Sequence, residues 1–200
     1  MTTQLRFLGP RSLAGAAALV AALALPATTL AANFEGTPGP DHLVGTDQAD
    51  TIRGFAGDDI LEGLGGNDDI AGGPDNDWIY GGAGADRIAG GEGNDKIRGG
   101  PGADAIYGGA GADVITGGAG FDVIGGGSGP DVLYGADGND LIAGGLGRDI
   151  VYGGAGNDVI RVGGDSTADA VHCGPGWDVA FVGRFDIADA SCERVVRKLE

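Results

Sequence analysis

A repeat of nine residues runs from Gly36 to Arg161 without a single insertion or deletion. Each of its fourteen blocks has glycine at the first position, aspartate at the sixth and an aliphatic residue at the eighth. One example is Gly81-Gly82-Ala83-Gly84-Ala85-Asp86-Arg87-Ile88-Ala89. A short fixed period of this kind predicts a solenoid, in which each block packs mainly on its neighbours.

The composition of a block predicts a turn followed by a short strand. Glycines at positions one, two and four permit a tight turn over the first six residues. Positions seven to nine then form a three-residue strand, with the eighth side chain facing inward and its neighbours facing outward. Two blocks make one coil of eighteen residues, so the fourteen blocks predict about seven coils.

Stacked coils place the aspartate of one block above the aspartate eighteen residues further on, as for Asp86 and Asp104. Carboxylates one strand spacing apart repel each other unless a cation lies between them. Ca²⁺ suits this position because it takes six to eight oxygen ligands, here carboxylates and carbonyls of the glycine turns. Zinc would require imidazole or thiolate ligands, and the repeats contain only His42.

The predicted calcium ligands form two sets, and pairing alternate blocks gives at most about twelve ions. The side-chain ligands are Asp41, Asp50, Asp59, Asp68, Asp77, Asp86, Asp95, Asp104, Asp113, Asp122, Asp131, Asp140, Asp149 and Asp158. The backbone carbonyl ligands are those of Gly81, Gly90, Gly99, Gly108, Gly117 and Gly126.

The blocks resemble the RTX, or hemolysin-type, calcium-binding repeats, whose pattern is G-G-x-G-x-D-x-U-x. The resemblance covers 126 of the 200 residues. It implies an all-β fold, a right-handed parallel β-roll. Enzymes of this family keep their catalytic residues in other domains, so the resemblance implies a calcium-binding module alone.

Folding is expected to depend on calcium. Ordering nine backbone residues costs on the order of 9 to 18 kcal/mol, whereas burying one Ile or Leu returns roughly 1.5 to 3 kcal/mol. Metal binding would supply the missing free energy, so we expect a largely disordered metal-free chain. Binding should be weakest in the first blocks, where Thr37, Thr46, Gln48, Phe55 and Leu64 replace turn glycines.

The first 32 residues have the layout of a secretory signal peptide. Arg6 and Arg11 precede an apolar run, and small residues follow, with cleavage expected after Ala31 or Ala32. The thirteen apolar residues from Leu13 to Leu25 are too few to span a bilayer. We therefore expect a secreted or cell-surface protein with no membrane insertion after cleavage. The β-roll would occupy residues 33–161.

Residues 162–200 are predicted to form a degenerate repeat and a C-terminal cap. Asp169 and Asp178 keep their order relative to the aliphatic residues, although the register breaks after Arg161. Cys173 and Cys192 are the only cysteines, and in an exported protein such a pair predicts a disulfide. The alternative is a metal site formed by both cysteines and His172.

Charge and motifs limit the function. A formal net charge of −17 disfavours nucleic acid and anionic membranes as partners. No serine lies in a nucleophile motif, so we do not expect an enzyme. The leading hypothesis is a secreted calcium-binding protein. The alternative is a structural or adhesive module that contacts a cell-surface glycan or protein, and a column with Tyr134 and Tyr152 could serve as a stacked ladder or as a carbohydrate platform.

Overall fold

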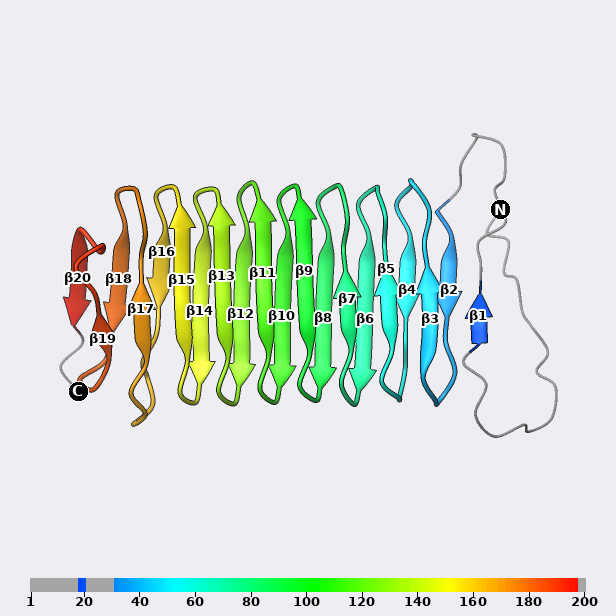
Figure 1. Ribbon diagram of the computed structural model, residues 1–200, viewed down its shortest axis with the longest axis horizontal. Coiled ribbons are helices and arrows are strands. Elements are labelled where there is room, and N and C mark those ends of the chain that lie inside the picture. Colours follow the sequence, from blue (N-terminus) through cyan, green and yellow to red (C-terminus); the bar gives the residue numbers. More distant parts are fainter. Residues whose placement is uncertain (1–17, 21–30, 198–200) are drawn as a thin grey trace.

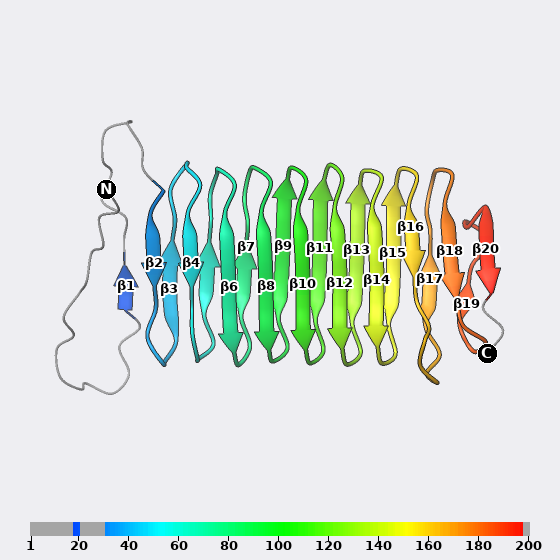
Figure 2. The ribbon, with the colours of Figure 1, turned by 180° about the vertical axis from the view of Figure 1, so that it is seen from behind.

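The computed structural model describes residues 18–20 and 31–197, and these form strands and turns without a helix. The strands make two parallel ten-stranded sheets. Sheet A contains the odd-numbered strands and sheet B the even-numbered strands. The chain alternates between the two sheets along an elongated body, as the front and back views show (Figures 1 and 2). The predicted all-β parallel solenoid is confirmed.

Most strands are short, and the longest have six residues. Sheet A comprises β1 (Ala18–Val20), β3 (Asp41–Val44), β5 (Ile60–Glu62), β7 (Trp78–Tyr80), β9 (Lys96–Pro101), β11 (Val114–Ala119), β13 (Val132–Asp137), β15 (Ile150–Ala155), β17 (Ala170–His172) and β19 (Ile187–Ala188). Sheet B comprises β2 (Asn33–Glu35), β4 (Thr51–Arg53), β6 (Asp69–Pro74), β8 (Arg87–Glu92), β10 (Ala105–Ala110), β12 (Val123–Ser128), β14 (Leu141–Leu146), β16 (Val159–Arg161), β18 (Val179–Val182) and β20 (Arg194–Arg197). The central strands exceed the expected three residues because the first three positions of the next block also pair.

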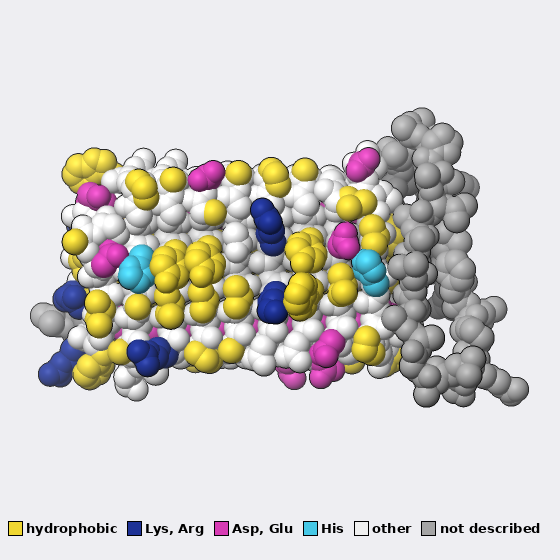
Figure 3. Space-filling model, viewed as in Figure 1, with side chains coloured by type: hydrophobic (Ala, Val, Ile, Leu, Met, Phe, Trp, Pro, Cys, Tyr) yellow, Lys and Arg dark blue, Asp and Glu magenta, His cyan; other side chains and the backbone are white. Residues whose placement is uncertain are grey.

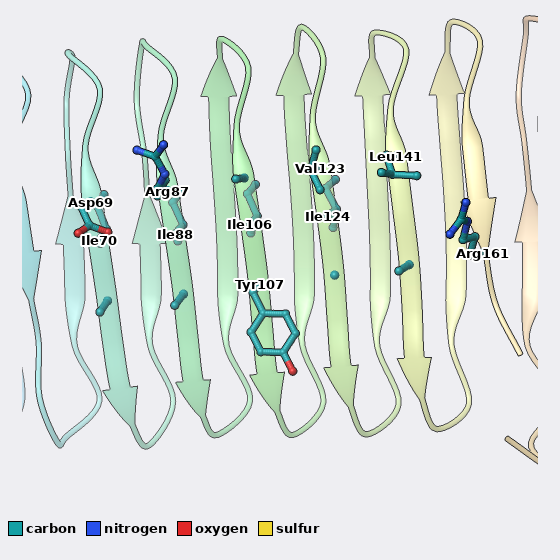
Figure 4. Close-up of a pocket in the computed structure, with 15 residues that line it drawn as sticks. Asp69, Ile70, Arg87, Ile88, Ile106, Tyr107, Val123, Ile124, Leu141 and Arg161 are labelled. Carbon is teal, nitrogen blue, oxygen red and sulfur yellow. The ribbon is translucent and has the colours of Figure 1, made fainter. Parts of the chain in front are cut away.

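The core is a ladder of eighth-position side chains. Ile88 pairs with Ile106, and Ile106 with Ile124, so the sheet register is eighteen residues. The eighth-position side chains from Leu43 to Ile160 are at most 3 % exposed. Figure 4 shows isoleucines of this ladder on successive strands, with Arg87 and Val123 on the outer face. Each buried aliphatic side chain contributes roughly 1.5 to 3 kcal/mol.

The turns need glycine where the coils approach most closely. Gly82 has a φ of 109°, and a Cβ there would overlap the carbonyl oxygen of Leu64 in the preceding coil. Leu64 itself has a φ of 74°, and Phe55 and Asp75 are also left-handed. Non-glycine residues can therefore replace some turn glycines without changing the backbone shape, at a cost in local strain.

The solenoid has about nine turns rather than the seven expected from the uninterrupted blocks. The reason is that two extra residues after Arg161 are absorbed in a turn. Ile150 pairs with Ala170, twenty residues later, and β18 and β20 extend sheet B beyond them. Residues 162–197 therefore continue both sheets.

The ends of the solenoid differ. At the C-terminal end, the predicted disulfide between Cys173 and Cys192 is present, with a Cα–Cα distance of 5.0 Å. At the other end, Ala18–Val20 of the predicted signal peptide pairs with β3. The other residues of that predicted segment up to residue 30 lie outside the described residues. In the part of the chain that the structure describes, no helix is long and apolar enough to cross a membrane.

Candidate calcium-binding turns

The fourteen predicted aspartates are buried inside the solenoid, each between 0 and 5 % exposed. They stand where a turn enters a strand, so that one column follows sheet A and the other follows sheet B. Column A contains Asp41, Asp59, Asp77, Asp95, Asp113, Asp131 and Asp149. Column B contains Asp50, Asp68, Asp86, Asp104, Asp122, Asp140 and Asp158. The predicted stacking of carboxylates is thus present.

One oxygen of each carboxylate is bound to the backbone. The amide of Asp86 donates to Oδ1 of Asp104 at 2.9 Å, and the amide of Asp104 donates to Oδ1 of Asp122 at 2.8 Å. The same bond recurs along both columns. From Asp50 onward, each aspartate therefore fixes the strand entry of the preceding coil, a role that the sequence pattern did not reveal.

The other oxygen, Oδ2, has no hydrogen-bond partner in most of the array. The buried and unpartnered Oδ2 atoms belong to Asp59, Asp68, Asp77, Asp86, Asp95, Asp104, Asp113, Asp122, Asp131, Asp140, Asp149, Asp158, Asp169 and Asp178. A buried carboxylate oxygen without a partner is costly, since it has lost its water and gained nothing in exchange. These oxygens are placed to accept a cation.

The glycine carbonyls predicted as ligands lie next to these oxygens. A Cβ on Gly81 would stand 2.5 Å from Oδ2 of Asp86 and 2.7 Å from the carbonyl oxygen of Gly99. The same arrangement places the carbonyl oxygens of Gly81, Gly90, Gly108, Gly117 and Gly126 beside Oδ2 of Asp68, Asp77, Asp95, Asp104 and Asp113, respectively. The first-position glycine is thus required because any side chain would fill the space between the two oxygens.

This set of donors fits a hard cation. Among the described residues, no group of three or more His, Cys, Asp or Glu side chains converges on one point. Carboxylate and carbonyl oxygens together are the ligands that Ca²⁺ takes in proteins. A complete coordination shell would therefore depend on the turn backbone as much as on the aspartates.

Burial makes these carboxylates hard to ionise. It raises the pKa of Asp77 and of Asp131 from 3.8 to about 7. It also raises the pKa of Asp59, Asp68, Asp95, Asp104, Asp122, Asp149 and Asp158 to about 6. Backbone N–H donors oppose these pKa shifts in part, and neighbouring carboxylates in the column add to most of them. A bound cation would favour the ionised form and so oppose these upward pKa shifts.

The first two turns satisfy Oδ2 of their aspartates within the chain. Thr46 donates to Oδ2 of Asp50 from its amide at 2.6 Å and from Oγ1 at 2.8 Å. Thr37 does the same for Asp41, at 2.5 Å and 3.0 Å. Asp41 and Asp50 consequently have no unpartnered Oδ2, unlike the twelve predicted ligands that follow them.

Asp169 and Asp178 were not among the predicted ligands, yet they continue the two columns. Asp149 donates its amide to Oδ1 of Asp169 at 2.9 Å, and Asp158 does so to Asp178 at 2.8 Å. The sequence feature that marks them is an aspartate followed two positions later by a core residue, as in Asp169 and Val171. Requiring a fixed nine-residue period hid this signal after the insertion.

Other predicted groups lie outside the turns. The disulfide leaves no free cysteine among the described residues, so the alternative metal site of both cysteines with His172 is wrong. His42 lies 2.8 Å from Glu62 and His172 lies 2.7 Å from Asp189, both on the outer face of sheet A that Figure 3 shows.

The predicted tyrosine ladder is present on the same face. The rings of Tyr134 and Tyr152 stack at 4.9 Å, and His172 extends the stack at 4.8 Å. Rings stacked face to face cover each other's faces, which favours a structural ladder over a carbohydrate platform.

A family model for the RTX calcium-binding nonapeptide repeat matches four times, at residues 35–70, 62–97, 89–124 and 125–166. The chain belongs to this RTX repeat family. Its matched segments include every turn from Gly36 to Arg161 and the insertion that follows, so the family assignment and the geometry of the turns agree. A comparison with curated proteins found no match.

Proposed function

We propose that this RTX chain is a secreted calcium-binding protein whose central turns fold when calcium binds. The observation that supports the proposal is the set of fourteen buried carboxylate oxygens without a partner. In a metal-free chain these oxygens would weaken the solenoid, because each is desolvated and lies beside others of the same charge. A bound cation supplies the opposite charge, and its binding free energy becomes folding free energy.

The proposed sites lie between successive unpartnered aspartates. Each column has seven of them, from Asp59 to Asp169 in column A and from Asp68 to Asp178 in column B. Seven aspartates define six intervals, so the two columns would hold up to about twelve ions. The proposed number equals the one expected from the sequence, but the sites are shifted by one coil toward the C-terminus.

The turns at Thr37 and Thr46 are proposed to be free of calcium. Their aspartates already accept two hydrogen bonds from threonine at Oδ2, and a cation would have to displace these donors. The first coil would then be a metal-independent cap. This agrees with the expectation that calcium binding is weakest at the N-terminal end.

Location outside the cell is consistent with this proposal. The predicted signal peptide and the disulfide both belong to exported proteins. Extracellular calcium is millimolar, the range in which extracellular modules bind it. No catalytic role is proposed. The second candidate function is an adhesive or structural module, in which the outer face of sheet A contacts a glycan or protein and calcium serves as scaffold.

The test is circular dichroism of the mature chain in chelator and in calcium. The expected result is a β-rich spectrum with calcium and a large loss of β signal with chelator, reversed by adding calcium but not by adding the same concentration of magnesium, which prefers rigid octahedral sites. An unchanged β spectrum in chelator would refute calcium-dependent folding. A glycan array screened with the calcium-loaded chain would test the adhesive alternative, which requires saturable binding to a glycan.

A further inference from the structure

A hollow of about 640 Å³ lies at the C-terminal end of sheet B, next to β16, β18 and β20. Three arginines line it, Arg161, Arg184 and Arg197, together with Phe181 and Phe185. Such a group is unusual in a chain with a formal net charge of −17.

These arginines have no carboxylate partner among the described residues, where the ion pairs within 4.0 Å are the two that involve histidine. Asp165 also lines the hollow, but its carboxylate accepts hydrogen bonds from other groups. The amide of Gly147 donates to its Oδ2 at 2.7 Å, and Thr167 Oγ1 donates to its Oδ1 at 2.6 Å. The three guanidinium groups therefore form no ion pair with the described carboxylates, and Asp165 adds one negative charge to a lining that carries three positive charges.

Each guanidinium is also held in place. Arg161 lies over the ring of Phe181, 5.3 Å from its centre, and Arg184 lies over Phe185 at 5.7 Å. Arg197 donates from Nη1 to the carbonyl oxygen of Asp186 at 3.2 Å. Arginines ordered in this way lose less entropy when a ligand binds, and stacking on a ring leaves the N–H edges free to donate.

We propose that this hollow binds a tetrahedral oxyanion, as a phosphate or sulfate ester of a small molecule. Three guanidinium groups from three segments suit an anion with three or more oxygens better than a planar carboxylate with two. Phe185, 55 % exposed, offers an apolar surface to the organic part of the ligand. The acidic body disfavours long polyanions, which would have to run along it.

The test is isothermal titration of the calcium-loaded full chain at constant ionic strength. The probes are glucose 6-phosphate and sodium sulfate, with glucose and sodium chloride as controls. We expect one saturable site for both oxyanions, with a dissociation constant of about 1 mM or lower, and none for the controls. Tighter binding of the sugar ester than of sulfate, lost in Phe185→Ala, would identify an ester as the ligand. Equal binding would identify the free anion.

Variants separate a built site from general charge attraction. Arg161→Gln and Arg184→Gln should each weaken binding at least about tenfold, because each removes a charge-assisted donor. Arg53→Gln, an exposed arginine on β4 of the same sheet, is the matched control and should leave binding unchanged. Absence of saturable binding by the wild-type chain, or equal weakening in the control, would overturn the proposal. Circular dichroism in calcium verifies that each variant is folded, and Arg161→Lys serves as a second variant that keeps the charge.

Discussion

The first two turns and the twelve that follow share the same buried aspartate but differ in what surrounds its second oxygen. Thr46 closes the turn around Asp50, whereas Oδ2 of Asp68, one coil later in the same column, has no partner. The core residue two positions after the aspartate is buried in both cases, and both carboxylates accept an amide at Oδ1. The difference means that, under the proposed assignment, an aspartate alone is not enough to make a calcium turn.

The second position of the block decides between the two kinds of turn. In the later blocks this residue has a positive φ, for example 109° at Gly82 and 76° at Phe55. A β-branched residue strongly avoids that region, and neither Thr37 nor Thr46 adopts it. The changed backbone directs the threonine amide and hydroxyl toward the aspartate. The comparison therefore predicts that position two and position six act together.

The largest effect is expected from blocking the space between the paired oxygens. In Gly99→Ala the new methyl group would overlap Oδ2 of Asp104 and would stand 2.6 Å from the carbonyl oxygen of Gly117. We expect destabilisation of about 1 to 3 kcal/mol from overpacking alone, and a further loss of bound calcium. Chemical denaturation in calcium measures the combined loss of stability. Gly39→Ala, where a Cβ would meet no atom within 4 Å, is the matched control and should behave like the wild type.

Removing the charge of one aspartate should reduce calcium binding in the later turns but not in the first two. Asp104→Asn keeps an oxygen that can accept the amide of Asp86 but removes the charge. The calcium concentration at half-folding should rise, and bound calcium should fall by one or two ions, since Asp104 faces two intervals. Asp50→Asn should change neither quantity. Equal losses of calcium in the two variants would contradict the assignment of separate roles.

The pKa shifts predict the effect of pH on the metal-free chain. Folding raises the pKa of Asp77 and of Asp131 to about 7, so the folded state binds protons more tightly than the unfolded state. Stability from these groups is present below the unfolded pKa near 4 and is lost as pH rises through 6 to 7. In chelator we expect more β-structure at pH 5 than at pH 8. The calcium midpoint should rise on acidification, because protons compete with the cation. A metal-free chain with less β-structure at pH 5 would be inconsistent with these shifts.

The smallest effect is expected from changing Thr46 in the first coil. Thr46→Gly removes the hydroxyl donor from Asp50 and permits the left-handed turn of the later blocks. At a calcium concentration that just folds the wild type we expect a loss of about 1 to 2 kcal/mol, partly restored at higher calcium because the turn then binds an ion. Thr116→Ala, on the outer face of β11, is the control. The proposed role of Thr46 is wrong if added calcium stabilises Thr46→Gly and Thr116→Ala by the same amount as the wild type.

The nine-residue period was sufficient to predict the solenoid, its core ladder and the stacking of the aspartates in two columns, and the family resemblance added the parallel arrangement. The disulfide followed from the two cysteines. Asp169 and Asp178 were missed as ligands because a two-residue insertion can be absorbed in a turn while the sheets continue, which a strict period does not allow. The role of Thr46 was missed for another reason. Its substitution for glycine was visible, but only the backbone conformation shows where its amide and hydroxyl point.

The most direct measurement is a crystal structure of the calcium-bound chain, with anomalous scattering used to locate the ions. We expect ions between successive aspartates from Asp59 to Asp169 and from Asp68 to Asp178, each beside an Oδ2 oxygen and a glycine carbonyl, with none at Asp41 or Asp50. Ions in the two threonine turns, or a folded chain without ions in the central turns, would contradict this expectation.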